Sequence, residues 1–66
     1  MRIELNGSPS EVADGTTIAD LLTLLQLPAN GIAVALDGEV VARADHAGAP
    51  VSEGSVVEIL TAVQGG

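Results

Sequence analysis

The chain contains no cysteine and no aromatic side chain, and this most limits what it can fold into. Its 66 residues support one small domain, which we expect to span residues 1–66. Domains of this size often rely on disulfides or a metal, but without cysteine there are no disulfides and no cysteine-based zinc sites. The core must therefore consist of valine, isoleucine, leucine and alanine, and 47% of the residues are hydrophobic.

The charge of the chain is strongly acidic. The chain has nine acidic residues, two arginines and no lysine, which gives a formal net charge of −7. This charge disfavours nucleic acid and anionic membranes, both of which attract basic proteins, and it favours a basic protein partner. The sequence shows no signal-peptide pattern and no apolar run near the ~20 residues that cross a bilayer, so we expect a cytoplasmic protein.

The first part of the sequence predicts a β-hairpin. Apolar and polar side chains alternate over residues 2–6, which is typical of a half-buried strand. Asn6-Gly7 predicts the hairpin turn because both residues tolerate a positive φ, and Ser8-Pro9 is expected to extend this turn. A second strand over residues 10–13 then pairs antiparallel with the first, before Asp14-Gly15 turns the chain again.

A helix is predicted to follow this hairpin. Thr17 and Asp20 have the spacing of a capping box, and Thr16 is the competing N-cap. Pro28 is expected to end the helix. Its apolar positions recur at the spacing of one helical face, and they are Ile18, Leu21, Leu22 and Leu25.

The second half of the sequence predicts three further strands. An apolar run over residues 32–36 and a shorter one over residues 39–42 are joined by Asp37-Gly38, which is again a hairpin signal. Residues 43–50 show no periodicity and are expected to form a loop with room for one helical turn. Residues 55–63 form the longest predicted strand.

These elements predict an α+β fold, in which one helix covers one face of a mixed sheet of about five strands. The first and last strands are expected to be the parallel central pair. Along the last strand Val57, Ile59, Thr61 and Val63 point one way, and Val56, Glu58, Leu60, Ala62 and Gln64 point the other way. The uncovered face is predicted to be a docking surface. On it we expect Leu60, Ala62, and either Ala33 and Ala35 or their neighbours, flanked by Glu4 and Asn6.

No side-chain constellation of a known enzyme class is found. The chain lacks cysteine and lysine nucleophiles, and no histidine lies near its serines in the sequence. We interpret His46, beside Asp45, as a solvated loop histidine, and the carboxylates of Asp37 and Glu39 as a solvated turn rather than a metal site. No glycine-rich phosphate loop is present. We therefore predict no catalytic side chain and no metal site.

One reactive group remains, the main-chain carboxylate of Gly66. A carboxylate is a poor electrophile until a partner activates it, for instance as an acyl adenylate made with ATP. Gly65 and Gly66 lack a Cβ atom and adopt any backbone conformation, so they fit a narrow channel beside a nucleotide. We expect a flexible tail over about residues 63–66, which follows directly on the last predicted strand.

Several stretches resemble one known family over the whole length of the chain. They are LNG at residues 5–7, DGTTIADLL at 14–22, GIAVALDGEVV at 31–41 and EGSVVEILTAVQGG at 53–66. The last stretch is the most specific, because it joins the final strand to the diglycine. The chain is similar to the ubiquitin-like sulfur carrier proteins and, among these, to the thiamine-pathway ThiS family.

This resemblance implies the β-grasp (ubiquitin-like) fold and a carrier that is not an enzyme and binds no cofactor itself. A ubiquitin-activating-type adenylyltransferase would use ATP to adenylate the carboxylate of Gly66. A persulfide sulfur donor would then displace AMP and leave a thiocarboxylate. Thiazole synthase would dock the carrier and take the sulfur for the thiazole ring of thiamine.

The resemblance also implies which residues meet these partners. Gly65, Gln64 and Val63 would lie in the partner's active site, and Leu60, Ala62 and Arg43 would lie at the interface. Arg43 fits a solvated loop equally well. Other functions stay open: a sulfur carrier for molybdopterin or cysteine synthesis, a ubiquitin-like protein modifier, or an interaction domain with an inert tail.

Overall fold

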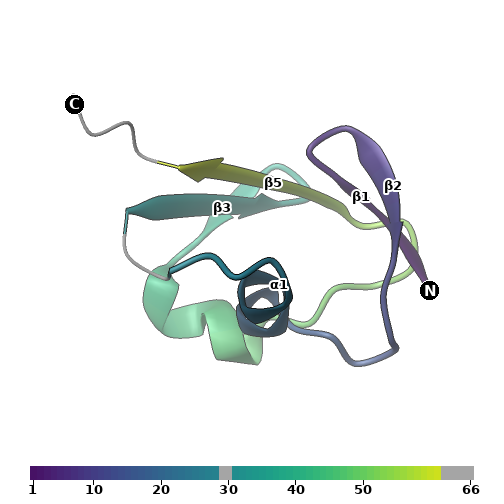
Figure 1. Ribbon diagram of the computed structural model, residues 1–66, viewed down its shortest axis with the longest axis horizontal. Helices are drawn as coiled ribbons and strands as arrows, with labels where there is room; N and C mark the ends of the chain where they lie inside the picture. Colours follow the sequence, from purple (N-terminus) through teal and green to yellow (C-terminus); the bar gives the residue numbers. More distant parts are fainter. Residues whose placement is uncertain (29–30, 62–66) are drawn as a thin grey trace.

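The structure, a computed structural model, describes residues 1–28 and 31–61 (Figure 1). The predicted end of the last strand at Ala62 and Val63 lies outside these residues. The elements in chain order are β1 (Arg2–Leu5), β2 (Ser8–Glu11), α1 (Ile18–Leu24), β3 (Ile32–Leu36), β4 (Glu39–Val41), the 3-10 helix η1 (Arg43–Gly48) and β5 (Val56–Thr61).

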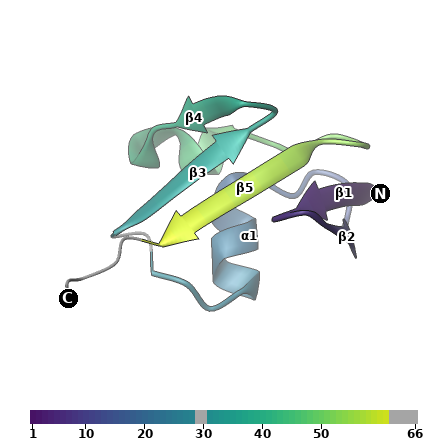
Figure 2. The same cartoon turned by 90° about the horizontal axis from the view of Figure 1, so that it is seen from above.

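The strands form one five-stranded sheet in the order β2-β1-β5-β3-β4. β1 and β5 are parallel, and the other neighbouring strands are antiparallel. α1 lies across one face of this sheet, and in Figure 2 it is seen behind β5 from the opposite, uncovered side. A single helix held against a mixed sheet with this central parallel pair is the β-grasp arrangement. The predicted fold class and the predicted central pair are therefore confirmed.

Both predicted hairpin turns are confirmed. Asn6-Gly7 has φ angles of 49° and 83°, and Asp37-Gly38 has φ angles of 52° and 88°. Two successive left-handed residues are the signature of the tight turn that suits twisted antiparallel strands. The prediction for Ser8-Pro9 was wrong, because both residues belong to β2 and Pro9 lies opposite Glu4. Proline is tolerated there because β2 is an edge strand.

The start of α1 follows the predicted capping box. The Thr17 hydroxyl accepts a hydrogen bond from the Asp20 N–H at 3.1 Å, and the Asp20 carboxylate accepts one from the Thr17 N–H at 3.1 Å. Two N–H groups that the helix itself leaves unpaired are thus satisfied. Thr16 is not the cap, since its hydroxyl donates to the carbonyl of Ala13 at 2.7 Å.

The end of α1 differs from the prediction, which placed it at Pro28. The helix ends at Leu24, and Gln26 adopts a left-handed φ of 59°. The Gln26 N–H donates to the carbonyl of Thr23, and the Leu27 N–H donates to that of Leu22, which is the hydrogen-bond pattern of a Schellman motif. Leu25 caps the helix and is 43% exposed, so it does not continue the buried face.

The core between α1 and the sheet is built from aliphatic side chains, as the composition requires. Its most buried member, Val57, has no exposed surface and lies on the central strand β5. Val51 is buried as well, although it lies outside the predicted elements. The buried cluster consists of Ile3, Ile18, Leu21, Leu22, Val34, Val51, Val57 and Ile59.

The segment after β4 contains the helical turn for which the prediction left room, but it corrects the prediction of a solvated histidine. Residues 43–48 form η1, which packs against α1. His46 is only 4% exposed, and its Nε2 atom lies 3.2 Å from the carbonyl oxygen of Val41. The short helix α1 covers only part of this face of the sheet. η1 covers a further part of the same face, and its His46 side chain is buried there.

We predict that Thr17→Ala lowers the free energy of unfolding by about 1 kcal/mol, because it removes the hydroxyl that caps α1. The matched control is Thr23→Ala in the same helix. The Thr23 hydroxyl donates to the carbonyl of Ala19 at 3.1 Å, a bond that does not favour a helix, so this change should stay within about 0.5 kcal/mol. Urea unfolding followed by circular dichroism measures both. Equal losses would contradict the capping role.

Candidate functional site

The polar side chains with clear partners serve the fold. The Ser55 hydroxyl accepts the Ser52 N–H at 2.9 Å, and the Asp37 carboxylate accepts the Val56 N–H at 2.9 Å. Within residues 1–28 and 31–61, no three histidine or acidic side chains gather where they could hold a metal ion. The helices in this part of the chain are also too short or too polar to cross a membrane. The exposed surfaces are therefore the candidates for a site.

The uncovered face of the sheet carries the predicted alternation of β5. Val57 and Ile59 are buried, whereas Val56 is 37% and Leu60 is 68% exposed. Ala33 lies opposite Leu60, so these two side chains share the uncovered face. Cross-strand pairing adds neighbours from β3 and β4 to the same face. We call this set the open-face patch, and it consists of Ala33, Ala35, Val40, Val56 and Leu60.

Acidic side chains lie within and beside the open-face patch. Glu58 lies between Val56 and Leu60 along β5, and Glu4 lies opposite Val56 on β1, as predicted. Asn6 was predicted to flank the patch as well, but its side-chain amide bonds to the main chain of Ile59 at the edge of β5. An apolar surface with one carboxylate in it and another beside it is suited to a partner that offers apolar side chains together with basic residues.

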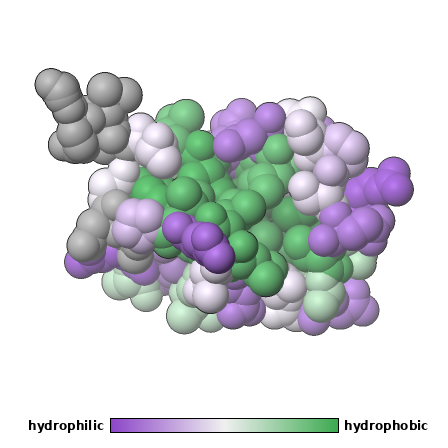
Figure 3. Space-filling view, in the orientation of Figure 1, coloured by the Kyte–Doolittle hydropathy of each residue, from purple (hydrophilic) through white to green (hydrophobic). Residues whose placement is uncertain are grey.

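A groove lies on the helix side of the sheet, at the end where β5 finishes. Its volume is about 450 Å³, and Figure 3 shows apolar residues gathered over this face between β5 and α1. Thr61 points to this side as predicted, but it is exposed because it lies at the end of the strand. The residues that line the groove are Leu5, Asn6, Leu25, Leu27, Ile59 and Thr61.

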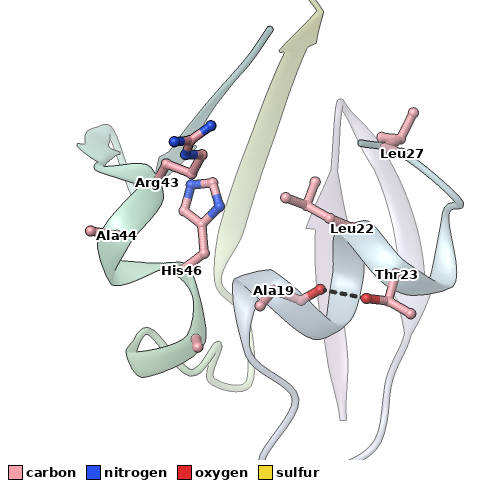
Figure 4. A pocket seen from close by; sticks show the side chains of 8 residues that line it. Ala19, Leu22, Thr23, Leu27, Arg43, Ala44 and His46 are labelled. Atoms are coloured by element: carbon pink, nitrogen blue, oxygen red, sulfur yellow. Dashed lines mark hydrogen bonds between the residues drawn. The ribbon is translucent and has the colours of Figure 1, made fainter. Parts of the chain in front are cut away.

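Arg43 lies at the same end of the sheet but not on the open-face patch. Val34 pairs with Val41, so two further residues along the chain place Arg43 near the level of Ile32, which pairs with Thr61. The Arg43 side chain lines a second groove, of about 310 Å³, between η1 and α1. Figure 4 shows Arg43 and His46 on the η1 side of this groove, and Leu22 and Thr23 on the α1 side.

The structure therefore places the predicted partner residues on two different sides of the sheet. Leu60 belongs to the open-face patch, and Arg43 lies on the helix side at the same end. The remaining residues of the predicted site lie outside the described residues, and they are Ala62, Val63, Gln64, Gly65 and Gly66.

Comparison with known proteins identifies the family. The model of the ThiS family matches residues 3–66. The chain belongs to the ThiS family. The match includes both the strands that build the open-face patch and the diglycine at residues 65–66. A search of curated proteins found no significant match.

Solved structures agree with the family. The crystal structure of a thiamine biosynthesis protein (ThiS) from Geobacter metallireducens is similar at a TM-score of 0.86 and 35% identity, with both chains covered completely. A solution structure of a thiamine biosynthesis protein from Geobacter metallireducens gives a TM-score of 0.83 at 35% identity, and covers all of this chain and 88% of the other. The similarity to a ThiS structure thus covers the whole chain.

Two features of the site were missed by the sequence analysis. The burial of His46 depends on η1 packing against α1. Residues 43–50 show no periodicity from which this packing could be predicted. The bonds from Asn6 to Ile59 depend on the register of β1 with β5. The turn signal at Asn6-Gly7 indicates only a short amide that can bond to main chain close by in the sequence, and it does not point to Ile59, 53 residues later.

We predict opposite outcomes for two neighbouring substitutions on β5. Ile59→Ala should lower the free energy of unfolding by about 2–5 kcal/mol, because it leaves a cavity in the core. Leu60→Ala should change it by no more than about 0.5 kcal/mol, because this side chain is 68% exposed. Thermal and urea unfolding of the two variants test this. Similar losses would mean that the two faces of β5 are not distinct.

Proposed function

We propose that this ThiS-family chain is a sulfur carrier of the thiamine pathway. One observation carries the proposal: the family match extends to residue 66 and so includes Gly65 and Gly66, which follow the central strand β5. The similar structures from Geobacter metallireducens are described as thiamine biosynthesis proteins, which supports the pathway. The carrier is a substrate of other enzymes and contributes no catalytic side chain of its own.

The proposed chemistry takes place on the carboxylate of Gly66. An oxygen of this carboxylate attacks the α-phosphorus of ATP in a ubiquitin-activating-type adenylyltransferase, and pyrophosphate leaves. The outer sulfur of a persulfide donor then attacks the acyl carbon, and AMP leaves. A second thiol attacks the inner sulfur of the resulting acyl disulfide, which releases the thiocarboxylate and forms a disulfide. Thiazole synthase receives the sulfur from this thiocarboxylate.

The carrier needs little more than a presented tail and a docking surface. ATP is bound and used by the partner, and the carrier holds no cofactor. Val63, Gln64 and Gly65 fill the narrow approach to the partner's active site, where an extended segment pairs in the manner of a strand. The open-face patch, which includes Leu60, contacts the partner together with Ala62, two residues later in the sequence, and Arg43 contacts it from the helix side of the same end.

We predict that incubation with a cognate adenylyltransferase, ATP and a persulfide donor raises the intact mass by about 16 Da, the difference between sulfur and oxygen. Oxidation of Met1 adds the same mass, so fragmentation must place the gain on Gly66. A variant lacking Gly65 and Gly66 is the control and should gain nothing. An unchanged wild-type mass, with an enzyme that adenylates its own carrier, would refute the proposal and favour a modifier or an inert tail.

We predict that Leu60→Ala raises the KM of adenylation for the carrier about five- to ten-fold, because it removes a central apolar contact of the interface. The matched control is Leu24→Ala. Leu24 is also 68% exposed but lies on α1, away from the open-face patch, so its removal should leave the KM unchanged. Equal KM values for both variants would exclude the open-face patch from the interface.

The pathway itself is tested by growth. In the native host, removal of the gene should produce a requirement for thiamine that the thiazole alone satisfies. A strain that grows without thiamine would instead favour a carrier for molybdopterin or cysteine synthesis.

A further inference from the structure

The edge of β5 that faces β1 carries hydrogen bonds beyond the point where β1 ends. The carbonyls of Ser55, Val57 and Ile59 face this edge in turn. They accept bonds from the N–H of Glu4 at 2.8 Å, from the N–H of Asn6 at 2.9 Å and from the side-chain Nδ2 of Asn6 at 3.3 Å. The third donor of this regular series is thus a side-chain amide, at a position where a continued strand would provide a main-chain N–H.

The same amide also replaces a main-chain acceptor. Leu5 pairs with Val57, so Asn6 lies opposite Glu58, and in a continued parallel ladder its carbonyl would accept the N–H of Ile59. The backbone instead turns away at Asn6, whose φ is 49°. The side-chain Oδ1 accepts the Ile59 N–H in its place, at 2.7 Å. Asn6 therefore adds one complete rung to the sheet after β1 has turned into the hairpin.

Asparagine is the residue type that combines a side-chain donor, a side-chain acceptor and tolerance of a left-handed φ. Its carboxamide donates and accepts side by side, as a peptide group does. Aspartate would keep the acceptor for the Ile59 N–H but would set a carboxylate against the Ile59 carbonyl. Glycine suits the left-handed turn but has neither group. This choice of residue at position 6 is therefore more specific than the turn alone requires.

The rung lies close to the exit of β5. Ile59 is two residues before Thr61, and residues 62–66 continue from there. On the other side of β5, pairing with β3 continues to Thr61. On the β1 side, Asn6 makes the last of the hydrogen bonds that the structure gives for the described part of β5.

We propose that Asn6 is a positioning residue for the tail. By fixing the end of β5 from the β1 side, it fixes the direction of the strand up to Thr61, after which the tail follows in the sequence, and so reduces the ordering that the activating enzyme must impose on the carrier. This inference rests on the proposed function, because it assigns Asn6 a role in presenting Gly66. It assigns Asn6 no contact with the reacting atoms.

The chain offers a closely matched control at the other end of β5. Asp37 is also the first residue of a tight turn, with a φ of 52°, and its Oδ1 accepts the N–H of Val56, the first residue of β5. Asp37→Gly therefore removes a side-chain bond to the same strand from the same kind of turn. It does so five residues before Thr61 along the chain, at the start of the strand.

The experiment compares wild-type protein with Asn6→Gly, Asn6→Asp and Asp37→Gly at a temperature where each is folded. For Asn6→Gly, amide hydrogen exchange at Ile59 should become about ten-fold faster relative to Val34, because two hydrogen bonds are lost. The KM for the carrier in ATP-dependent adenylation should rise about five-fold. The kcat should change little, since a tail that is already bound in the enzyme's active site reacts at the normal rate.

The other variants separate positioning from stability. Asp37→Gly should lower the melting temperature but leave the Ile59 exchange and the KM near their wild-type values. Asn6→Asp should fall between wild type and Asn6→Gly in both measurements, and it serves in place of Asn6→Gly if the glycine variant does not fold.

Two results would overturn the inference. If wild-type protein is adenylated and the Asn6 variants show the wild-type KM, the positioning role is refuted while the proposed function stands. If wild-type protein is not adenylated by an enzyme that is active on its own carrier, the proposed function and the role of Asn6 both fail.

Discussion

The parallel pairing of β1 with β5 is the interaction on which the rest of the structure depends. It places β5 in the middle of the sheet, so that Val57 is enclosed completely and the core gathers on one side of this strand. A parallel pair needs a crossover connection, and α1 within that crossover is held against the sheet. With no aromatic or disulfide support, closing this aliphatic layer is what stabilises the fold. The opposite side of β5 is left to the solvent.

The polar side chains follow from this arrangement. Asn6 and Asp37 satisfy main-chain groups at the two places where neighbouring strands turn away from β5. Thr17 and Asp20 satisfy the start of α1, and Ser55 satisfies the turn before β5. These groups hold one strand and one helix in place. A small domain of this kind is well suited to present a reactive group that other proteins transform.

The sequence predicted those elements whose cause is local. The turns at Asn6-Gly7 and Asp37-Gly38 depend on residues that accept a positive φ, and the two faces of β5 depend on alternation, so both were found. The capping box was found for the same reason. From these elements the helix α1 and the uncovered face followed, and with them Leu60 as a surface residue.

The errors concern the local end of one helix and contacts between distant parts of the chain. α1 ends through a left-handed Gln26, and glutamine is not a residue type from which this conformation is predicted. His46 is buried by the packing of η1 on α1, and the bonds of Asn6 require knowledge of the register that brings it to Ile59, 53 residues later in the chain. The proposed contact surface was therefore predictable, whereas the side chains that hold its edge were not.

The edge strand β2 has a consequence for how molecules of this protein meet one another. Met1 and Val12 exchange both of their main-chain hydrogen bonds, and from this pair the alternation of the ladder directs the nitrogen of Pro9 outward. Proline has no N–H, so the outer edge of β2 lacks a donor in the middle of the strand. A strand from a second molecule cannot pair continuously along this edge, which disfavours fibrillar self-association through β2 at high concentration.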